Sequence, residues 1–130
     1  MILLDTNILI YCLKGREPVT SRVISAPPRE VAIPSVVAFE LEYGTLKAGN
    51  IRRHAILSGL LANLEEIPFD REAAREAARI RVELEKGGQL IGPIDLLIAG
   101  TAMSRGAGLV TNNAKEFSRI KGLRLFDWMR

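Results

Sequence analysis

The chain has 130 residues, 48% of them apolar and 25% charged, which excludes a disordered chain and indicates one folded domain over residues 1–130. A single cysteine and a single histidine exclude a disulfide framework and a Cys/His zinc site, and they disfavour a histidine-dependent nucleophile. The net charge of +3 leans mildly toward polyanionic partners. Because neither a secretion signal nor an uncharged run of membrane-spanning length is visible, we expect a cytoplasmic protein without membrane contact.

The first predicted elements are one strand and two short helices. The apolar run 2–4 indicates a buried strand, and a helix over 6–13 follows it, capped by Asp5 or Thr6. A second helix over 18–25 ends before a pair of prolines. These segments begin an alternation of strands and helices.

A second strand and two amphipathic helices come next. The strand covers 31–33, and Ser35 can cap a helix that ends at Gly49. Apolar side chains spaced by three and four predict one apolar face of that helix: Val36, Phe39, Tyr43 and Leu46. The following helix has its own apolar set: Ile56, Leu57, Leu60, Leu61 and Leu64. These apolar residues fit either a core or a dimer surface.

The rest of the chain continues the alternation. In order, it predicts a strand over 66–69, a helix over 70–86, a helix from Pro93 to Ser104 or Arg105, a strand over 109–111, a helical turn over 114–117 and a strand over 123–126. Strands that alternate with helices favour an α/β fold, in which helices cover both faces of a central, mainly parallel sheet of four or five strands.

Three carboxylates lie near the end of a predicted strand or near the beginning of a predicted helix. Asp5 follows the first strand, Glu40 lies in the helix that opens at Ser35, and Asp95 lies in the first turn of the helix that opens at Pro93. In α/β sheets such positions can meet beyond the carboxyl ends of the strands. Because three converging acids repel one another, a hard cation such as Mg²⁺ is their natural partner. This chemistry points to phosphodiester hydrolysis.

Each acid also has a simpler local explanation. Asp5 could serve only as a helix cap, Glu40 could be an ordinary solvated side chain, and Asp95 could complement a helix dipole. Asp95 stands out because no other charge occurs between Lys86 and Arg105, and a lone acid in an apolar helix is costly without a partner. The joint placement of the three acids is therefore the stronger argument.

Several segments, in order, resemble the motifs of PIN-domain nucleases and of the bacterial VapC toxins among them. The matching segments are Asp5-Thr6-Asn7, Glu40-Leu41-Glu42-Tyr43-Gly44, Gly92-Pro93-Ile94-Asp95, Leu109-Val110-Thr111-Asn112-Asn113 with Glu116-Phe117, and the closing run 122–128. The resemblance implies a PIN-like three-layer α/β/α sandwich. It also implies a Mg²⁺- or Mn²⁺-dependent endoribonuclease toxin that acts on RNA, forms a homodimer or a larger toxin–antitoxin assembly, and is inhibited by a cognate VapB-like antitoxin.

The resemblance also implies roles for individual residues. The three acids match catalytic and metal-binding positions: Asp5, Glu40 and Asp95. Four residues are expected to support them: Asn7, Thr111, Asn113 and Glu116. Asn113 stands where many PIN domains have aspartate, so the sequence leaves open whether a second metal ion binds. Glu116 is a weaker substitute for the missing fourth acid. Asn7 is expected to orient Asp5, and Thr111 with Asn113 to hydrogen-bond water or phosphate.

Other classes remain open on the sequence. An inactive PIN-fold binding module is favoured only by Asn113. A phosphoaspartyl hydrolase would use Asp5 as nucleophile, but it needs an acid where Asn7 stands. A receiver-type signalling domain would need an acidic pair near the first strand and a lysine after the last strand. Neither can be assigned in this sequence. The basic stretch 115–130, with five basic and two acidic residues, is either a solvated surface or a phosphate contact.

Overall fold

The computed structural model describes residues 1–130, with a five-stranded sheet at its centre. All neighbouring strands are parallel, in the order β3-β2-β1-β4-β5. The strands are β1 (Ile2–Leu4), β2 (Val31–Pro34), β3 (Glu65–Ile67), β4 (Gly108–Val110) and β5 (Leu125–Phe126). The predicted α/β class and parallel sheet are confirmed. The last three strands differ from the predicted ranges by one or two residues at their ends, where short strands fray.

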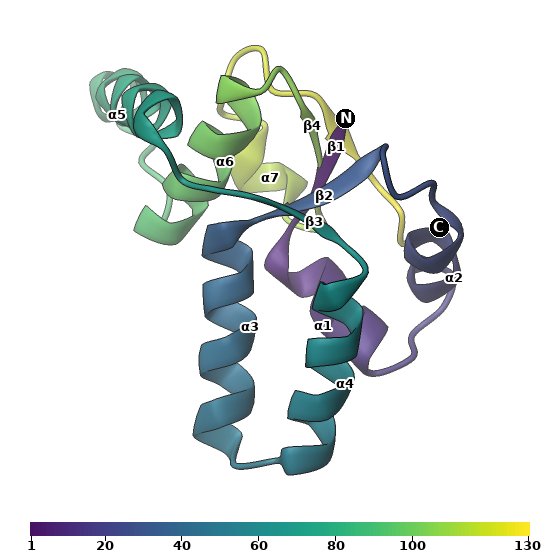
Figure 1. The fold of residues 1–130 in the computed structure, drawn as a ribbon. Coiled ribbons are helices and arrows are strands. Elements are labelled where there is room, and N and C mark those ends of the chain that lie inside the picture. The colour runs from purple at the N-terminus through teal and green to yellow at the C-terminus, as the bar shows by residue number, and fades with distance from the viewer.

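Seven helices pack around the sheet. They are α1 (Thr6–Leu13), α2 (Val19–Ser25), α3 (Ser35–Ala48), α4 (Ile51–Ala62), α5 (Arg71–Lys86), α6 (Pro93–Ser104) and α7 (Ala114–Phe117). Figure 1 shows the strands running between the α5–α6 pair and the group formed by α1, α3 and α4, with α3 and α4 as a hairpin that projects from the sheet. No helix combines the length and the apolarity that crossing a membrane requires.

The strand order places a topological switch beside β1. From β1 the chain proceeds outward through β2 and β3 on one side, and β4 and β5 occupy the other. Leu3 and Leu4 in β1 are fully buried, as are Leu109 and Val110 in β4, because helices cover both faces of these strands. The backbone N–H of Asp5 donates to the carbonyl of Val110 at 3.0 Å. In parallel sheets the crevice at such a switch is the usual ligand site.

The apolar face predicted for α3, for which core and dimer surface were both open, is mostly not part of the core. Three of its four members point to solvent, with exposed fractions of 56–66%: Phe39, Tyr43 and Leu46. The helix instead buries a set rotated around its axis: Val36, Val37, Ala38, Leu41 and Thr45. Both sets have helical spacing, and only the packing of α3 on its neighbours decides between them.

The start of α3 also differs from the prediction. Pro34 occupies the N-cap position, and no side chain caps the helix. The hydroxyl of Ser35 donates to Glu66 at 2.8 Å, a residue of the neighbouring strand β3. The predicted cap of α1 is confirmed as Asp5, and the long helix α5 begins after its own cap, Asp70.

A close crossing of α5 and α6 yields the first testable prediction. A Cβ on Gly100 would lie 2.7 Å from the Cβ of Ala77 and 2.8 Å from the backbone oxygen of Ala73, atoms that cannot rotate away. We expect Gly100→Ala to lower the free energy of unfolding by about 1–3 kcal/mol in urea titrations. The matched control is Gly44→Ala in α3, where a Cβ meets nothing within 4 Å, and which should raise that energy by about 0.5–1 kcal/mol. Equal stabilisation by both variants would contradict the close crossing.

Candidate active site

Asp5 is held at the carboxyl end of β1 by two hydrogen bonds. Its side chain is 4% exposed. The backbone N–H of Thr6 donates to Oδ1 at 2.8 Å, and the hydroxyl of Thr111 donates to Oδ2 at 2.7 Å. The backbone N–H of Asn113 in turn donates to the Thr111 hydroxyl at 2.9 Å. The strand ends that the sequence placed at one crevice therefore meet there, and Thr111 connects them.

Glu40 reaches the same crevice from the second turn of α3. The hydroxyl of Thr6 donates to its Oε1 at 2.5 Å. Thr6 thus contacts two candidate acids, Asp5 through its backbone and Glu40 through its side chain. In the sequence, Thr6 is visible only as a possible cap and as the neighbour of Asp5 in the segment Asp5-Thr6-Asn7. Glu42 lies on another side of α3 and contacts His54 of α4 at 2.8 Å.

Asp95 completes the acidic cluster from the first turn of α6, where it is half-buried. The pKa of Asp95 is raised to about 6, first because burial penalises its charged form. Three carboxylates add to this shift by repulsion: Asp5, Glu116 and Glu40. A hydrogen bond with Glu116 acts in the same direction. The four acids thus influence one another although they come from four separate segments.

The pKa of Asp5 is raised as well. Burial is the main cause, and the charge of Glu40 adds to it. The hydrogen bonds from Thr111 and Thr6 act in the opposite direction because they stabilise the carboxylate. Repulsion of this kind between acids is common at functional sites that bind a cation.

The polar residues expected to support the acids divide into two groups. Thr111 contacts Asp5 directly, whereas Asn7 does not: its Nδ2 donates to Oδ1 of Asn112 at 3.4 Å. The expected orientation of Asp5 by Asn7 is therefore wrong, because Asn7 lies on the exposed side of α1. Asn112 also donates to the hydroxyl of Tyr11 at 2.6 Å, a contact that the sequence did not predict. These bonds join the turn after β4 to α1.

The donor chemistry of the cluster suits a hard divalent cation. All four acidic side chains offer carboxylate oxygens, which Mg²⁺ and Mn²⁺ prefer. As they lie, however, no three carboxylates surround one point closely enough to ligate an ion together. Mg²⁺ commonly keeps several of its waters and takes only one or two carboxylates directly. The donor set therefore fits such an ion with part of its coordination supplied through water.

Comparison with known families and proteins gives one consistent result. Residues 2–123 match the family model of the PIN domain. The chain is 38% identical over 127 residues to a Shigella flexneri protein named "tRNA(fMet)-specific endonuclease VapC", a match that covers 97% of this chain and 96% of the relative. It is also 38% identical over 129 residues to "Ribonuclease VapC2" of Rickettsia felis, again covering 97% and 96%.

Solved structures show the same likeness in three dimensions. The structure of DNA-bound VapBC from Salmonella typhimurium matches with a TM-score of 0.91 and 39% identity, covering 98% of this chain and 97% of that chain. VapBC2 of Rickettsia felis bound to a promoter DNA fragment matches with a TM-score of 0.88 and 37% identity, covering 98% and 99%. Each of these matches includes the crevice described above.

Proposed function

This chain belongs to the PIN-domain family, and we propose that it is the endoribonuclease toxin of a VapBC-type toxin–antitoxin pair. Relatives named as VapC ribonucleases match it over nearly their whole length. The observation that carries the proposal is the meeting of four carboxylates from four segments beside β1 and β4. A phosphoaspartyl hydrolase is disfavoured because the required second acid is absent at Asn7, and the side chain of Asn7 donates to Asn112.

The proposed mechanism divides the work among the acids. Asp5 and Asp95 would hold a Mg²⁺ or Mn²⁺ ion directly or through water, and Glu40 would complete the acidic pocket. Such an ion would supply polarisation of the scissile phosphate and a lowered pKa of the attacking water. An acid of the pocket would orient that water, Thr111 and Asn113 would hydrogen-bond water or phosphate, and Glu116 would be a weaker substitute for a fourth acid. Thr111 keeps Asp5 in place through its hydroxyl.

The proposed chemistry predicts the products. Cleavage through the ribose 2′-OH needs a general base such as histidine, but the single histidine contacts Glu42, outside the acidic cluster. Hydrolysis by an oriented water is expected instead, leaving a 5′-phosphate on the downstream fragment. End-labelling of the fragments distinguishes the two routes.

The proposed partners follow from the family. We infer that the chain acts in the cytoplasm, forms a homodimer, and is inhibited by a cognate VapB-like antitoxin, because solved relatives are VapBC complexes. The exposed stripe Phe39, Tyr43 and Leu46 on α3 is one apolar surface available for such assembly. A test combines the purified chain, RNA and the product of the neighbouring short gene. RNA cleavage should stop when that product is added, and unchanged cleavage would contradict the pairing.

Thr6 provides a prediction about positioning within the site. Thr6→Val removes the hydroxyl that holds Glu40 but keeps the size of the side chain and the backbone cap of α1. We expect the maximal rate of RNA cleavage to fall by about ten- to a hundredfold, because a small displacement of a catalytic group is costly. Thr6→Ser keeps the hydroxyl and should retain most of that rate. Equal rates for the two variants would show that the contact with Glu40 does not matter.

A further inference from the structure

A hollow of about 470 Å³ lies between the end of α5 and the segment that follows α7. Three cationic side chains line it: Lys86, Arg119 and Lys121. The remaining lining is Glu83, Leu84, Gly87 and Gln89. The acidic cluster contributes no residue to this hollow, so it is a separate feature of the molecular surface.

The charge of the hollow is not balanced by its own acids. The cations Lys86, Arg119 and Lys121 form no ion pair, whereas other basic residues of α5 do. The one acid in the lining, Glu83, accepts from Arg79 at 2.9 Å. Lys86 could be explained by the negative end of the α5 dipole. Arg119 and Lys121 come from a different segment, and that explanation does not cover them.

The hollow adjoins the segments that carry two of the acids. Arg119 follows Glu116 by three residues, and its Nη1 donates to the carbonyl of Leu90 at 3.4 Å. Leu90 lies in the loop that leads into α6 and Asp95. The hollow therefore borders the loop and the turn that bring Asp95 and Glu116 to the crevice.

We propose that this hollow binds backbone phosphates of the RNA strand next to the bond that is cut. The inference rests on the proposed ribonuclease function and deepens it by assigning a binding site for the substrate backbone. Arginine offers a planar fork of donors to phosphate oxygens, and lysine offers a compact charge. Contacts to phosphates position a strand without reading its bases. The hollow thus sets affinity and register, while base selection belongs to other surfaces.

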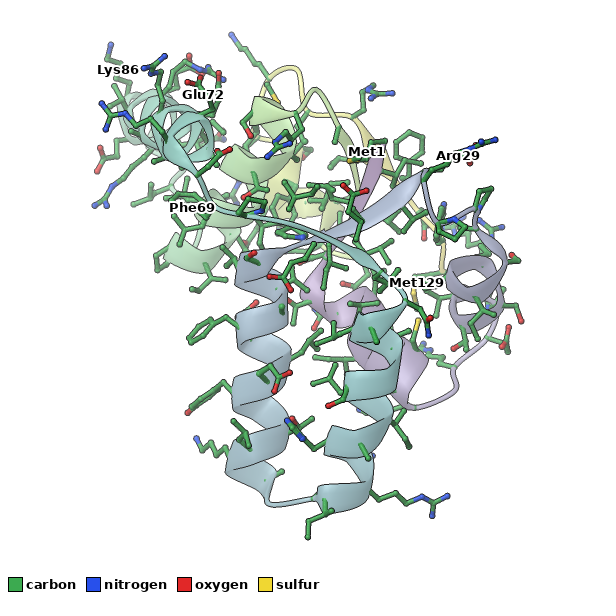
Figure 2. All side chains as sticks on the ribbon, viewed as in Figure 1. Met1, Arg29, Phe69, Glu72, Lys86 and Met129 are labelled. Carbon is green, nitrogen blue, oxygen red and sulfur yellow. The ribbon has the colours of Figure 1, made fainter.

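The test replaces cations with uncharged glutamine and leaves the acids untouched. Lys86→Gln/Lys121→Gln removes two cations of the hollow and keeps Arg119, which anchors Leu90. The matched control is Arg22→Gln/Arg29→Gln, which removes two exposed cations that form no ion pair. Figure 2 shows Lys86 at the end of α5 and Arg29 on the opposite side of the molecule. Both double variants lower the net charge by the same amount.

The first measurement is cleavage of a single-stranded RNA of mixed sequence at a series of concentrations. We expect the hollow variant to raise KM about five- to tenfold with little change in kcat, because the contacts bind phosphate and do not enter the chemistry. The second measurement is binding of the same RNA between about 50 and 200 mM salt. The salt dependence of log K should become shallower by about 1.4 for two lost phosphate contacts.

The outcomes separate this inference from the function on which it rests. If the wild-type protein neither cuts nor binds RNA, the proposed function fails and the inference fails with it. If the wild-type protein cuts RNA but both double variants behave alike, only the inference is overturned. Loss of antitoxin inhibition with normal RNA binding in the hollow variant would also overturn it, because the hollow would then contact protein. Equal melting temperatures of the two variants exclude a folding defect as the cause.

Discussion

Replacing Asp95 with asparagine is expected to abolish RNA cleavage and to raise the melting temperature of the protein. Asparagine keeps the shape of the side chain but loses the charge that a divalent cation requires. Removing one such ligand should lower the cleavage rate by at least about a hundredfold. The pKa of Asp95 is raised in the folded protein by burial first and then by repulsion from neighbouring acids, and asparagine removes both penalties because it carries no charge. Activity and stability should therefore move in opposite directions.

The stability gain has a defined pH dependence. The pKa of Asp95 is raised from 3.8 to about 6, so its charge destabilises the fold increasingly as the pH rises from about 4 through about 6. The full shift corresponds to about 3 kcal/mol, but Asp95 is half-exposed, and solvent screening reduces the expected gain to about 1 kcal/mol. For a domain of this size that gain amounts to about 3–5 °C. It should be present at pH 7.5 without divalent cations and absent near pH 4.

Thermal melts and cleavage assays on matched proteins check this result. Asp127→Asn is the control, because Asp127 is exposed and its contacts stay within the C-terminal segment: Oδ1 accepts from the backbone N–H of Met129 at 2.9 Å, which asparagine can also do, and Oδ2 lies 3.5 Å from Arg130. It should leave cleavage and the melting temperature nearly unchanged. Equal cleavage by the wild-type protein and Asp95→Asn in Mg²⁺ would refute the assignment of Asp95. A lower melting temperature at pH 7.5 would refute the repulsion among the acids.

Removing divalent cations should have the second large effect, a loss of RNA cleavage of at least about a hundredfold. The carboxylates of the cluster repel one another and lack a basic partner, so the attacking water has no other source of activation in the pocket. EDTA should stop cleavage, and excess Mg²⁺ or Mn²⁺ should restore it. Cleavage that persists in EDTA would contradict the proposed mechanism, provided that Asp95→Asn protein purified in parallel shows none.

A binding readout makes the metal prediction independent of activity. An ion that binds the folded state raises its melting temperature. Mg²⁺ or Mn²⁺ should therefore stabilise the wild-type protein, but it should have little effect on the Asp5→Asn/Asp95→Asn double variant. The double variant keeps a hydrogen-bond acceptor at the cap of α1, so its fold should survive. Equal stabilisation of both proteins would place the ion elsewhere.

Two of the candidate acids could be found from the sequence because each has a local signature. Asp5 follows a buried apolar strand, and Asp95 is a lone charge in an apolar helix. Their partners have no such signature. Thr6 donates to a residue 34 positions away, and Thr111 to one 106 positions away, so only the folded chain reveals these bonds. Asn7 was assigned to Asp5 because it is near in sequence, and it contacts Asn112 instead.

Helix α3 shows where periodicity stops being informative. The spacing of Phe39, Tyr43 and Leu46 is as regular as that of a core face, yet these side chains are exposed. Periodicity indicates which residues share a face of a helix, but it does not indicate whether another element covers that face. The hairpin of α3 and α4 projects from the sheet in Figure 1, which leaves one side of α3 without a neighbour.

By itself the sequence determined the alternation of strands and helices, most of their boundaries, and the candidate acids, because caps, prolines and apolar runs act over a few residues. The tertiary structure alone decided the strand order, the inward face of α3, and the meeting of Asp5, Glu40, Asp95 and Glu116. The physical reason is the separation along the chain over which each kind of interaction acts. Local patterns reflect neighbours along the chain, whereas repulsion, burial and raised pKa values depend on neighbours in space.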